Sequence, residues 1–239
     1  MHLQSYLTDD ALAAAAAAAW LDAIAAAQAA GRDFTVALSG GRVMRKFFAA
    51  ALSQAAERRM DFKRVRFFWA DERCVGPDDA ESNFRLADES LLRPAAVPAE
   101  NVHRVRGELA PAAAALAAGA ELRRVCGAAA GGLPELDLVL LGMGEDGHVA
   151  SLFPGNPQTE ADMTSVCVAV LDSPKPPPER VSLGHGPLAA ARSVWVLASG
   201  SGKQAALRDS LAAGGCTPLA RVIQRRAAIT IFTDIGLAC

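Results

Sequence analysis

The 239-residue sequence has little of what marks metal-binding, disulfide-rich or nucleic-acid-binding proteins. Its five cysteines are odd in number and widely spaced, and no two stand in the C-x-x-C spacing of metal sites and redox motifs. The 24 Lys and Arg nearly balance the 26 Asp and Glu, which leaves a formal net charge of −2. This charge gives no overall attraction to nucleic acid or to an anionic membrane. We therefore expect free thiols, no metal, and no nucleic-acid or membrane partner.

We expect no export signal, although one stretch resembles it at first sight. Residues 11–30 read ALAAAAAAAWLDAIAAAQAA, which is apolar and close to the N-terminus. However, Asp9 and Asp10 stand where a signal peptide has basic residues, and Asp22 interrupts the run. Alanine is a weak driver of membrane insertion compared with leucine or phenylalanine. These features favour a cytoplasmic protein.

The same stretch has the pattern of a packed helix. Leu12, Trp20 and Ile24 recur near helical spacing, and Thr8 or Asp9 can cap the helix start. Beyond it, short apolar runs alternate with helical stretches along the chain. Continuous apolar strands between helices predict an α/β fold with a mostly parallel sheet and helices on both faces. No linker is long enough to divide the chain, so we expect one domain over residues 1–239.

Four predicted strands end in glycine-rich or charged sequence. These ends are Ser39–Arg42, Asp71–Arg73, Gly142–His148 and Ser199–Lys203. In an open parallel sheet, ligands bind beyond the carboxyl ends of the strands. The sequence therefore predicts one site that these four segments share.

The segment DLVLLGMGEDGHVASLFPG (residues 137–155) raises two alternatives. Its glycines at 142, 144 and 147 match G-x-G-x-x-G after a strand, which is the fingerprint of a dinucleotide site. Against this, Glu145 and Asp146 lie inside the turn, where they would repel a pyrophosphate. Pro154 and Pro157 also stop any helix after about two turns. The second alternative is a turn that presents Asp146 and His148, and we favour it.

His148 is the candidate general base. A lone histidine is more often structural, but this one follows a strand, a glycine turn and an acid two residues earlier. A carboxylate beside an imidazole fixes its tautomer and raises its basicity, which a general base needs. Metal ligation is poorly supported, since no second His or Cys lies at ligand spacing.

The other strand ends carry candidate anion-binding residues. In LSGGR, two glycines let backbone N–H groups approach an anion at a helix start, although an ordinary tight turn has the same appearance. Arg73 follows the apolar FFWA, where it is either solvated or turned into the site; Lys203 begins a helix after SGSG. No Walker Lys-Ser/Thr follows the glycines, so a single phosphate fits better than a nucleoside triphosphate.

Taken together, these motifs resemble the 6-phosphogluconolactonase family. The matching stretches are LSGG, FFWADERCVGPDDAESNF, LLGMGEDGHVASLFPG, PKPPPERVSLG and GSGKQAAL, in the family's order over about residues 35 to 210. The resemblance implies a Rossmann-like fold shared with the glucosamine/galactosamine-6-phosphate isomerase superfamily. It also implies hydrolysis of 6-phospho-D-glucono-1,5-lactone to 6-phosphogluconate in the oxidative pentose phosphate pathway, without a cofactor or a covalent intermediate.

The resemblance also assigns roles to residues of this sequence. It implies His148 as the general base, Asp146 as its orienting acid, and Arg73 as the cation near the phosphate or the oxyanion. The residues that match phosphate-holding positions are Ser39, Gly40, Gly41 and Lys203, with Arg42 as an added cation. Asp71 and Arg180 are further candidates.

Two departures from the family pattern concern substrate affinity. After Ser-Gly-Gly the family commonly has a hydroxyl residue and then Thr-Pro, whereas this chain has Arg42, Val43 and Met44. Ala189 stands about where the family has Asn. Two rival functions remain: a sugar-phosphate isomerase or deaminase, although an expected acid after Asp-Gly-His is missing, and a non-catalytic sugar-phosphate sensor. We expect a monomer in each case.

Overall fold

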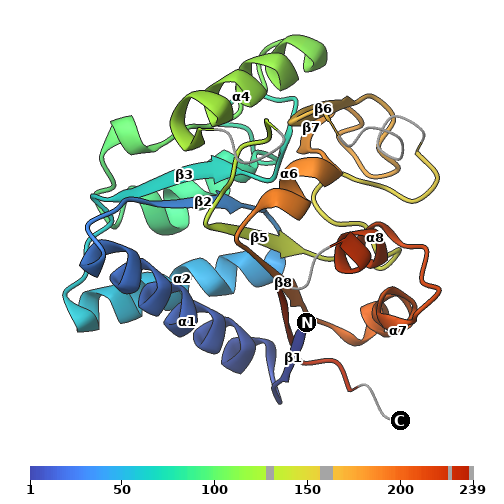
Figure 1. The fold of residues 1–239 in the computed structure, drawn as a ribbon, viewed down its shortest axis with the longest axis horizontal. Helices are drawn as coiled ribbons and strands as arrows, with labels where there is room; N and C mark the ends of the chain where they lie inside the picture. Colours follow the sequence, from blue (N-terminus) through green and yellow to red (C-terminus); the bar gives the residue numbers. More distant parts are fainter. Residues whose placement is uncertain (128–131, 157–163, 226–227, 237–239) are drawn as a thin grey trace.

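The computed structural model describes residues 1–127, 132–156, 164–225 and 228–236. Within these ranges the centre of the molecule is a six-stranded sheet in the order β1-β9-β8-β5-β2-β3, and every neighbouring pair is parallel (Figure 1). Its strands are β1 (His2–Ser5), β2 (Phe34–Leu38), β3 (Val65–Trp69), β5 (Leu138–Gly142), β8 (Ser193–Ala198) and β9 (Ile229–Thr233). The predicted α/β fold with a mostly parallel sheet is confirmed.

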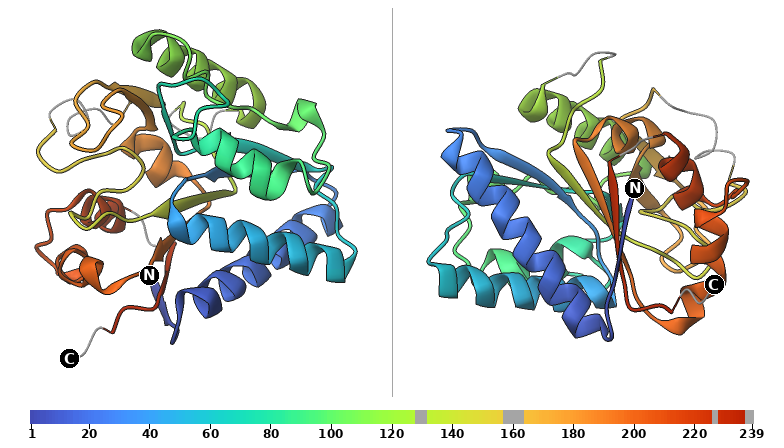
Figure 2. Two further views of the ribbon diagram at one scale, coloured as in Figure 1. Left: turned by 180° about the vertical axis from the view of Figure 1, so that it is seen from behind. Right: turned by 60° about the horizontal axis from the view of Figure 1, so that its bottom comes forward.

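Helices cover both faces of this sheet, as predicted. Figure 2 shows α1 (Asp9–Ala29) and α2 (Arg42–Arg58) in blue on one side, and α7 (Gln204–Leu211) and α8 (Pro218–Arg225) in orange and red on the other. Two buried apolar clusters fill the space between these layers. The remaining elements outside the smaller sheet described below are α3 (Asn83–Ala87), a π-helical turn (Asp88–Leu92), a 3₁₀ turn (Ala99–Asn101), α4 (Pro111–Cys126), α6 (His185–Ala190) and a 3₁₀ turn (Ser201–Lys203).

Helix α1 forms where the sequence predicts it. The Thr8 hydroxyl accepts a hydrogen bond from the Ala11 N–H and caps the helix. Leu12, Trp20 and Ile24 are fully buried, so the apolar stripe faces the core. By length and composition α1 is apolar enough to cross a membrane. Its burial shows that it serves as a core helix in this fold.

One predicted strand is divided. The sequence suggests a single strand over Arg64–Arg73, but β3 ends at Trp69 and β4 (Asp71–Arg73) belongs to a second, antiparallel sheet in the order β4-β7-β6. Ala70 joins the two sheets: its N–H donates to Leu38 in the large sheet, and its carbonyl accepts from the Leu183 N–H in the small one. The apolar runs SVCVAVL (Ser165–Leu171) and RVSLG (Arg180–Gly184), which also have the pattern of strands, contain β6 (Cys167–Val170) and β7 (Arg180–Leu183) of this sheet.

The chain order places a natural binding position between β2 and β5. From β2 the sheet grows outward to β3, whereas from β5 it grows the other way through β8 and β9. At such a switch point, the loops after two neighbouring strands turn in opposite directions and leave a crevice. The loops that begin at Ser39 and Gly142 follow these two strands. The glycines within them therefore lie side by side.

Candidate functional site

A cavity of about 540 Å³ opens at this switch point. The four predicted strand-end segments all contribute to it. Every predicted site residue except Asp146 lines it: Ser39, Gly40, Gly41, Arg42, Asp71, Arg73, His148, Arg180 and Lys203. The four predicted strand ends therefore meet at one cavity, although they lie far apart in the chain.

The turn after β5 holds Asp146 and His148 in a fixed relation. The Gly144 N–H donates to the His148 carbonyl, and a Cβ on Gly144 would collide with the His148 ring and the Asp146 carboxylate. Gly147 has φ +78°, and a Cβ there would collide with Thr217 at the start of α8. No helix is formed over residues 142–156. The glycines thus shape a tight turn, and the geometry of a dinucleotide cradle is not present there.

His148 is held by its acid neighbour. Its Nδ1 lies 2.5 Å from Oδ1 of Asp146, and the ring packs against Phe153 with 4.6 Å between centroids. Because the Asp146 carboxylate accepts a hydrogen bond from Nδ1–H, Nε2 is the basic nitrogen of the neutral ring. Burial lowers the pKa of His148, the Asp146 charge opposes this, and Lys175 lowers the pKa further. The ring is therefore neutral at neutral pH, as a base must be.

The loop after β2 offers an anion site at the start of α2. Gly41 has φ +102° and precedes the helix, and no side chain caps the first N–H groups of α2. Such free N–H groups and the helix dipole favour an anion. The Ser39 hydroxyl donates to the Leu140 carbonyl and ties β2 to β5.

Two cations from different strand ends converge beside this loop. A Cβ on Gly200 would lie 3.4 Å from a guanidinium nitrogen of Arg42, so Arg42 reaches the loop that carries Lys203. Asp234 holds that loop by accepting hydrogen bonds from the Ser199 hydroxyl and the Gly200 N–H. Burial, followed by the charges of Arg42 and Lys175, lowers the pKa of Lys203. Crowded cations of this kind gain most when an anion binds between them.

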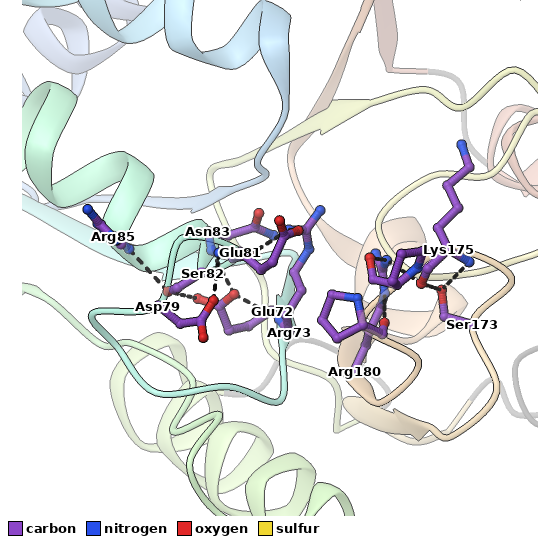
Figure 3. Close-up of polar contacts among 12 residues, drawn as sticks. Glu72, Arg73, Asp79, Glu81, Ser82, Asn83, Arg85, Ser173, Lys175 and Arg180 are labelled. Carbon is purple, nitrogen blue, oxygen red and sulfur yellow. Dashed lines mark hydrogen bonds and ion pairs between the residues drawn. The ribbon is translucent and has the colours of Figure 1, made fainter.

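Arg73 lies at the start of a loop that faces the cavity (Figure 3). Its guanidinium donates to the Glu81 carbonyl at 2.6 Å, which holds the side chain within its own loop. At the other end of the loop, the Asn83 amide donates to the backbone carbonyl of Asp71 at 2.9 Å. Asp71 in turn accepts a hydrogen bond from the Ser151 hydroxyl at 2.7 Å.

Arg180 holds a second loop rather than standing free for a ligand. Its guanidinium donates to the backbone carbonyls of Lys175, Pro176 and Pro177, and its side chain is buried (Figure 3). This arrangement places Lys175 at the cavity. Arg180 is one of the further candidates predicted from the sequence, and its hydrogen bonds shape this loop.

Sequence reasoning missed Lys175, Asn83, Glu72 and Ser151. The first two line the cavity, and the other two hold the residues that do. Lys175 lies within the quoted stretch PKPPPERVSLG and Asn83 within FFWADERCVGPDDAESNF, but no role in the site was predicted for either residue. Within the described ranges, no group of three or more His, Cys, Asp or Glu side chains is arranged to hold a metal ion. Cys74, Cys126, Cys167 and Cys216 are free thiols.

The fold and the cavity define an α/β protein with a cationic site at the switch point of its sheet. The chain matches the model of the glucosamine-6-phosphate isomerases/6-phosphogluconolactonase family over residues 7–231, and it belongs to this family. It is 36% identical over 224 residues to the 6-phosphogluconolactonase of Mycobacterium tuberculosis, which covers 91% of this chain and 87% of that protein.

Two further relatives extend the comparison. A protein of Oryza sativa subsp. indica named "Probable 6-phosphogluconolactonase 3, chloroplastic" is 35% identical over 214 residues, which is 84% of this chain. The chain spans only 64% of the length of that rice protein. The solved structure of 6-phosphogluconolactonase from Trypanosoma cruzi superposes with a TM-score of 0.85 at 27% identity, covering 100% of this chain and 97% of the other.

Proposed function

We propose that this protein hydrolyses 6-phospho-D-glucono-1,5-lactone to 6-phospho-D-gluconate. The observation that carries the proposal is the Asp146–His148 pair beside a cavity lined by five cationic side chains of the described chain: Arg42, Arg73, Lys175, Arg180 and Lys203. A base next to a cationic pocket suits a reaction that activates water on a phosphorylated substrate. The names of the most similar relatives support this substrate.

In the proposed reaction the phosphate is bound by the Gly40–Arg42 loop and Lys203, which directs the lactone carbonyl toward His148. Nε2 of His148 takes a proton from water as the water oxygen attacks C1. Arg73 stabilises the resulting oxyanion. The tetrahedral intermediate then collapses, the C1–O5 bond breaks, and the His148 imidazolium returns its proton to O5. An activated ester needs no covalent intermediate. His148 ends the cycle neutral, and the carboxylic acid formed at C1 releases its remaining proton to solvent to give 6-phosphogluconate.

The function has two alternatives within or near this family. A glucosamine-6-phosphate isomerase or deaminase would need a further acid for ring opening, and the segment SLFP after the Asp-Gly-His turn provides none. A sugar-phosphate sensor would not need the Asp146–His148 pair. For this chain we further propose a single domain over residues 1–239, a monomer, a cytoplasmic location, and no need for a metal, cofactor, nucleic acid or membrane.

The experiment that tests the proposal separates these reactions. The purified protein is given the freshly made lactone, with 6-phosphogluconate measured by a coupled dehydrogenase and spontaneous ring opening subtracted. A parallel reaction contains glucosamine 6-phosphate, with ammonia as the readout. We expect rapid lactone hydrolysis and no ammonia. Ammonia release would establish the deaminase, and binding of the phosphate ester without turnover of either compound would establish the sensor.

A further inference from the structure

Glu72 is a buried acid for which the reaction as described has no use. It lies between Asp71 and Arg73, and its side chain is almost fully buried. Its carboxylate does not line the cavity. Burying a charge of this kind is costly unless hydrogen bonds compensate, so its partners show what it does.

The partners of the Glu72 carboxylate among the described residues are all donors, and Arg73, Ser82 and Asn83 are labelled in Figure 3. Oε1 accepts from the N–H of Arg73 at 2.7 Å and from the N–H of Asn83 at 2.8 Å. Oε2 accepts from the N–H of Phe84 at 2.7 Å and from the Ser82 hydroxyl at 3.2 Å. One carboxylate therefore binds both ends of the loop from residue 73 to residue 83 and closes it.

This loop brings two groups to the cavity, one at each end. Arg73 enters at its first residue, and Asn83 at its last residue contacts both Asp71 and Gly40. The carboxylate touches the backbone N–H of both. The hydrogen bonds of Glu72 thus set the spacing between Arg73 and Asn83, although Glu72 itself does not line the cavity.

We propose that Glu72 is a positioning residue of the reaction, which closes the 73–83 loop and thereby fixes Arg73 and Asn83 at the cavity. The proposal rests on the proposed function for its catalytic consequence, but the closure of the loop itself is independent of any substrate. The ionised carboxylate suits these contacts, because it can accept all four hydrogen bonds, three of them from backbone N–H groups that can only donate. Burial raises the pKa of Glu72 to about 7, against the opposing effect of the three backbone N–H groups. The test is therefore run at about pH 8, where the carboxylate is ionised.

The first measurement is amide hydrogen exchange in Glu72→Gln. The glutamine NH₂ must face at least one backbone N–H, so we expect the amides of Arg73, Asn83 or Phe84 to exchange at least about tenfold faster than in the wild type. Glu89→Gln is the matched control, because Glu89 is an exposed acid of the same region that pairs with Arg85. Unchanged exchange in Glu72→Gln would overturn the proposal, and no lactone is needed to see it.

The second measurement links the loop to catalysis. Glu72→Gln should lower kcat about 10- to 100-fold with a smaller rise in KM, because the phosphate loop is affected only through the contact of Asn83 with Gly40. In an Arg73→Ala background, the same substitution should cost much less, since Glu72 acts through Arg73. An equal loss in both backgrounds, or a rise in KM alone, would overturn the positioning role.

A third variant covers the case in which Glu72→Gln does not fold. Glu72→Asp keeps the negative charge but is one methylene shorter, so it cannot reach both ends of the loop at once. We expect faster exchange at Asn83 and Phe84 and a smaller loss of kcat than in Glu72→Gln. Wild-type exchange and wild-type kcat in Glu72→Asp would also contradict the proposal. If the wild type does not hydrolyse the lactone, the proposed function fails, and the exchange data still decide whether Glu72 closes the loop.

Discussion

Two opposing effects act on the pKa of His148, and their balance decides whether the ring is neutral or charged. Burial favours the neutral ring, whereas the Asp146 carboxylate at Nδ1 favours the imidazolium. Burial is the larger of the two, so the pKa of His148 lies below its usual value. In the proposed reaction, the carboxylate orients the ring and stabilises the imidazolium that would form. Asp146 can do this without lining the cavity.

The acid limb of the pH profile should reflect this balance. A base is active when unprotonated, so kcat/KM should fall only as pH drops through a value below the usual 6.5 of histidine. In Asp146→Asn the opposing charge is lost, so the midpoint should move lower still, and kcat should drop about 100-fold or more because the tautomer is no longer fixed. The measurement is kcat/KM against pH, corrected for spontaneous opening. A midpoint above 6.5 would speak against a buried neutral base.

Lys203 should act mainly on binding. It lies among other cations at the cavity, and its proposed partner is the substrate phosphate, which does not change during the reaction. Lys203→Ala should therefore raise KM about 10- to 100-fold with a smaller effect on kcat. Lys63→Ala is the control, because Lys63 is exposed and pairs with Asp61. A large loss of kcat at unchanged KM would argue against an anchoring role.

At the scale of elements, the turns after the strands hold the site together. Much of this was predictable: local signals such as the Thr8 cap, the apolar strands and the glycine turn all appear in the structure. The break at Ala70 was not predictable, because it depends on a hydrogen bond from Leu183, far along the chain. Lys175 was not predicted as a site residue for a similar reason. Its position depends on a hydrogen bond from Arg180 to its backbone carbonyl, which no sequence pattern reveals.

Position 40 needs glycine because a neighbouring side chain leaves no room for a Cβ, and not because of its backbone dihedral angles. A Cβ at this position would overlap the side-chain amide of Asn83, which would have to leave Asp71. Gly40→Ala should therefore lower kcat/KM about 10- to 100-fold, because an error of about 1 Å in a site is this costly. Gly76→Ala is the matched control: a Cβ there meets nothing within 4 Å. The prediction fails if the two variants have the same kcat/KM.

For the whole molecule, net charge and local charge differ in sign. The chain carries a formal net charge of −2, yet five cationic side chains of the described residues line one cavity against the acids Asp71 and Glu145. A negative net charge is therefore compatible with a specific anion site. The position of that site follows from the sheet order, which brings the loops after β2 and β5 together.

This local charge predicts how ionic strength affects the reaction. The KM for the phosphorylated lactone should rise as salt increases from about 0.01 M to 0.5 M, because ions screen the cationic cavity. Glucono-1,5-lactone without a phosphate should have a much higher KM that hardly depends on salt. The measurement is steady-state kinetics on both lactones over this range. Equal salt dependence for the two compounds would mean that the cations do not bind the phosphate.

The most direct test of the account is turnover of the phosphorylated lactone by His148→Ala. The variant is first shown to fold with a thermal midpoint close to that of the wild type, and His2→Ala, a change at an exposed histidine, serves as the control. If His148 is the general base, kcat should fall about 10²- to 10⁴-fold in His148→Ala and remain unchanged in His2→Ala. Turnover by folded His148→Ala within a few-fold of the wild type would contradict the central claim.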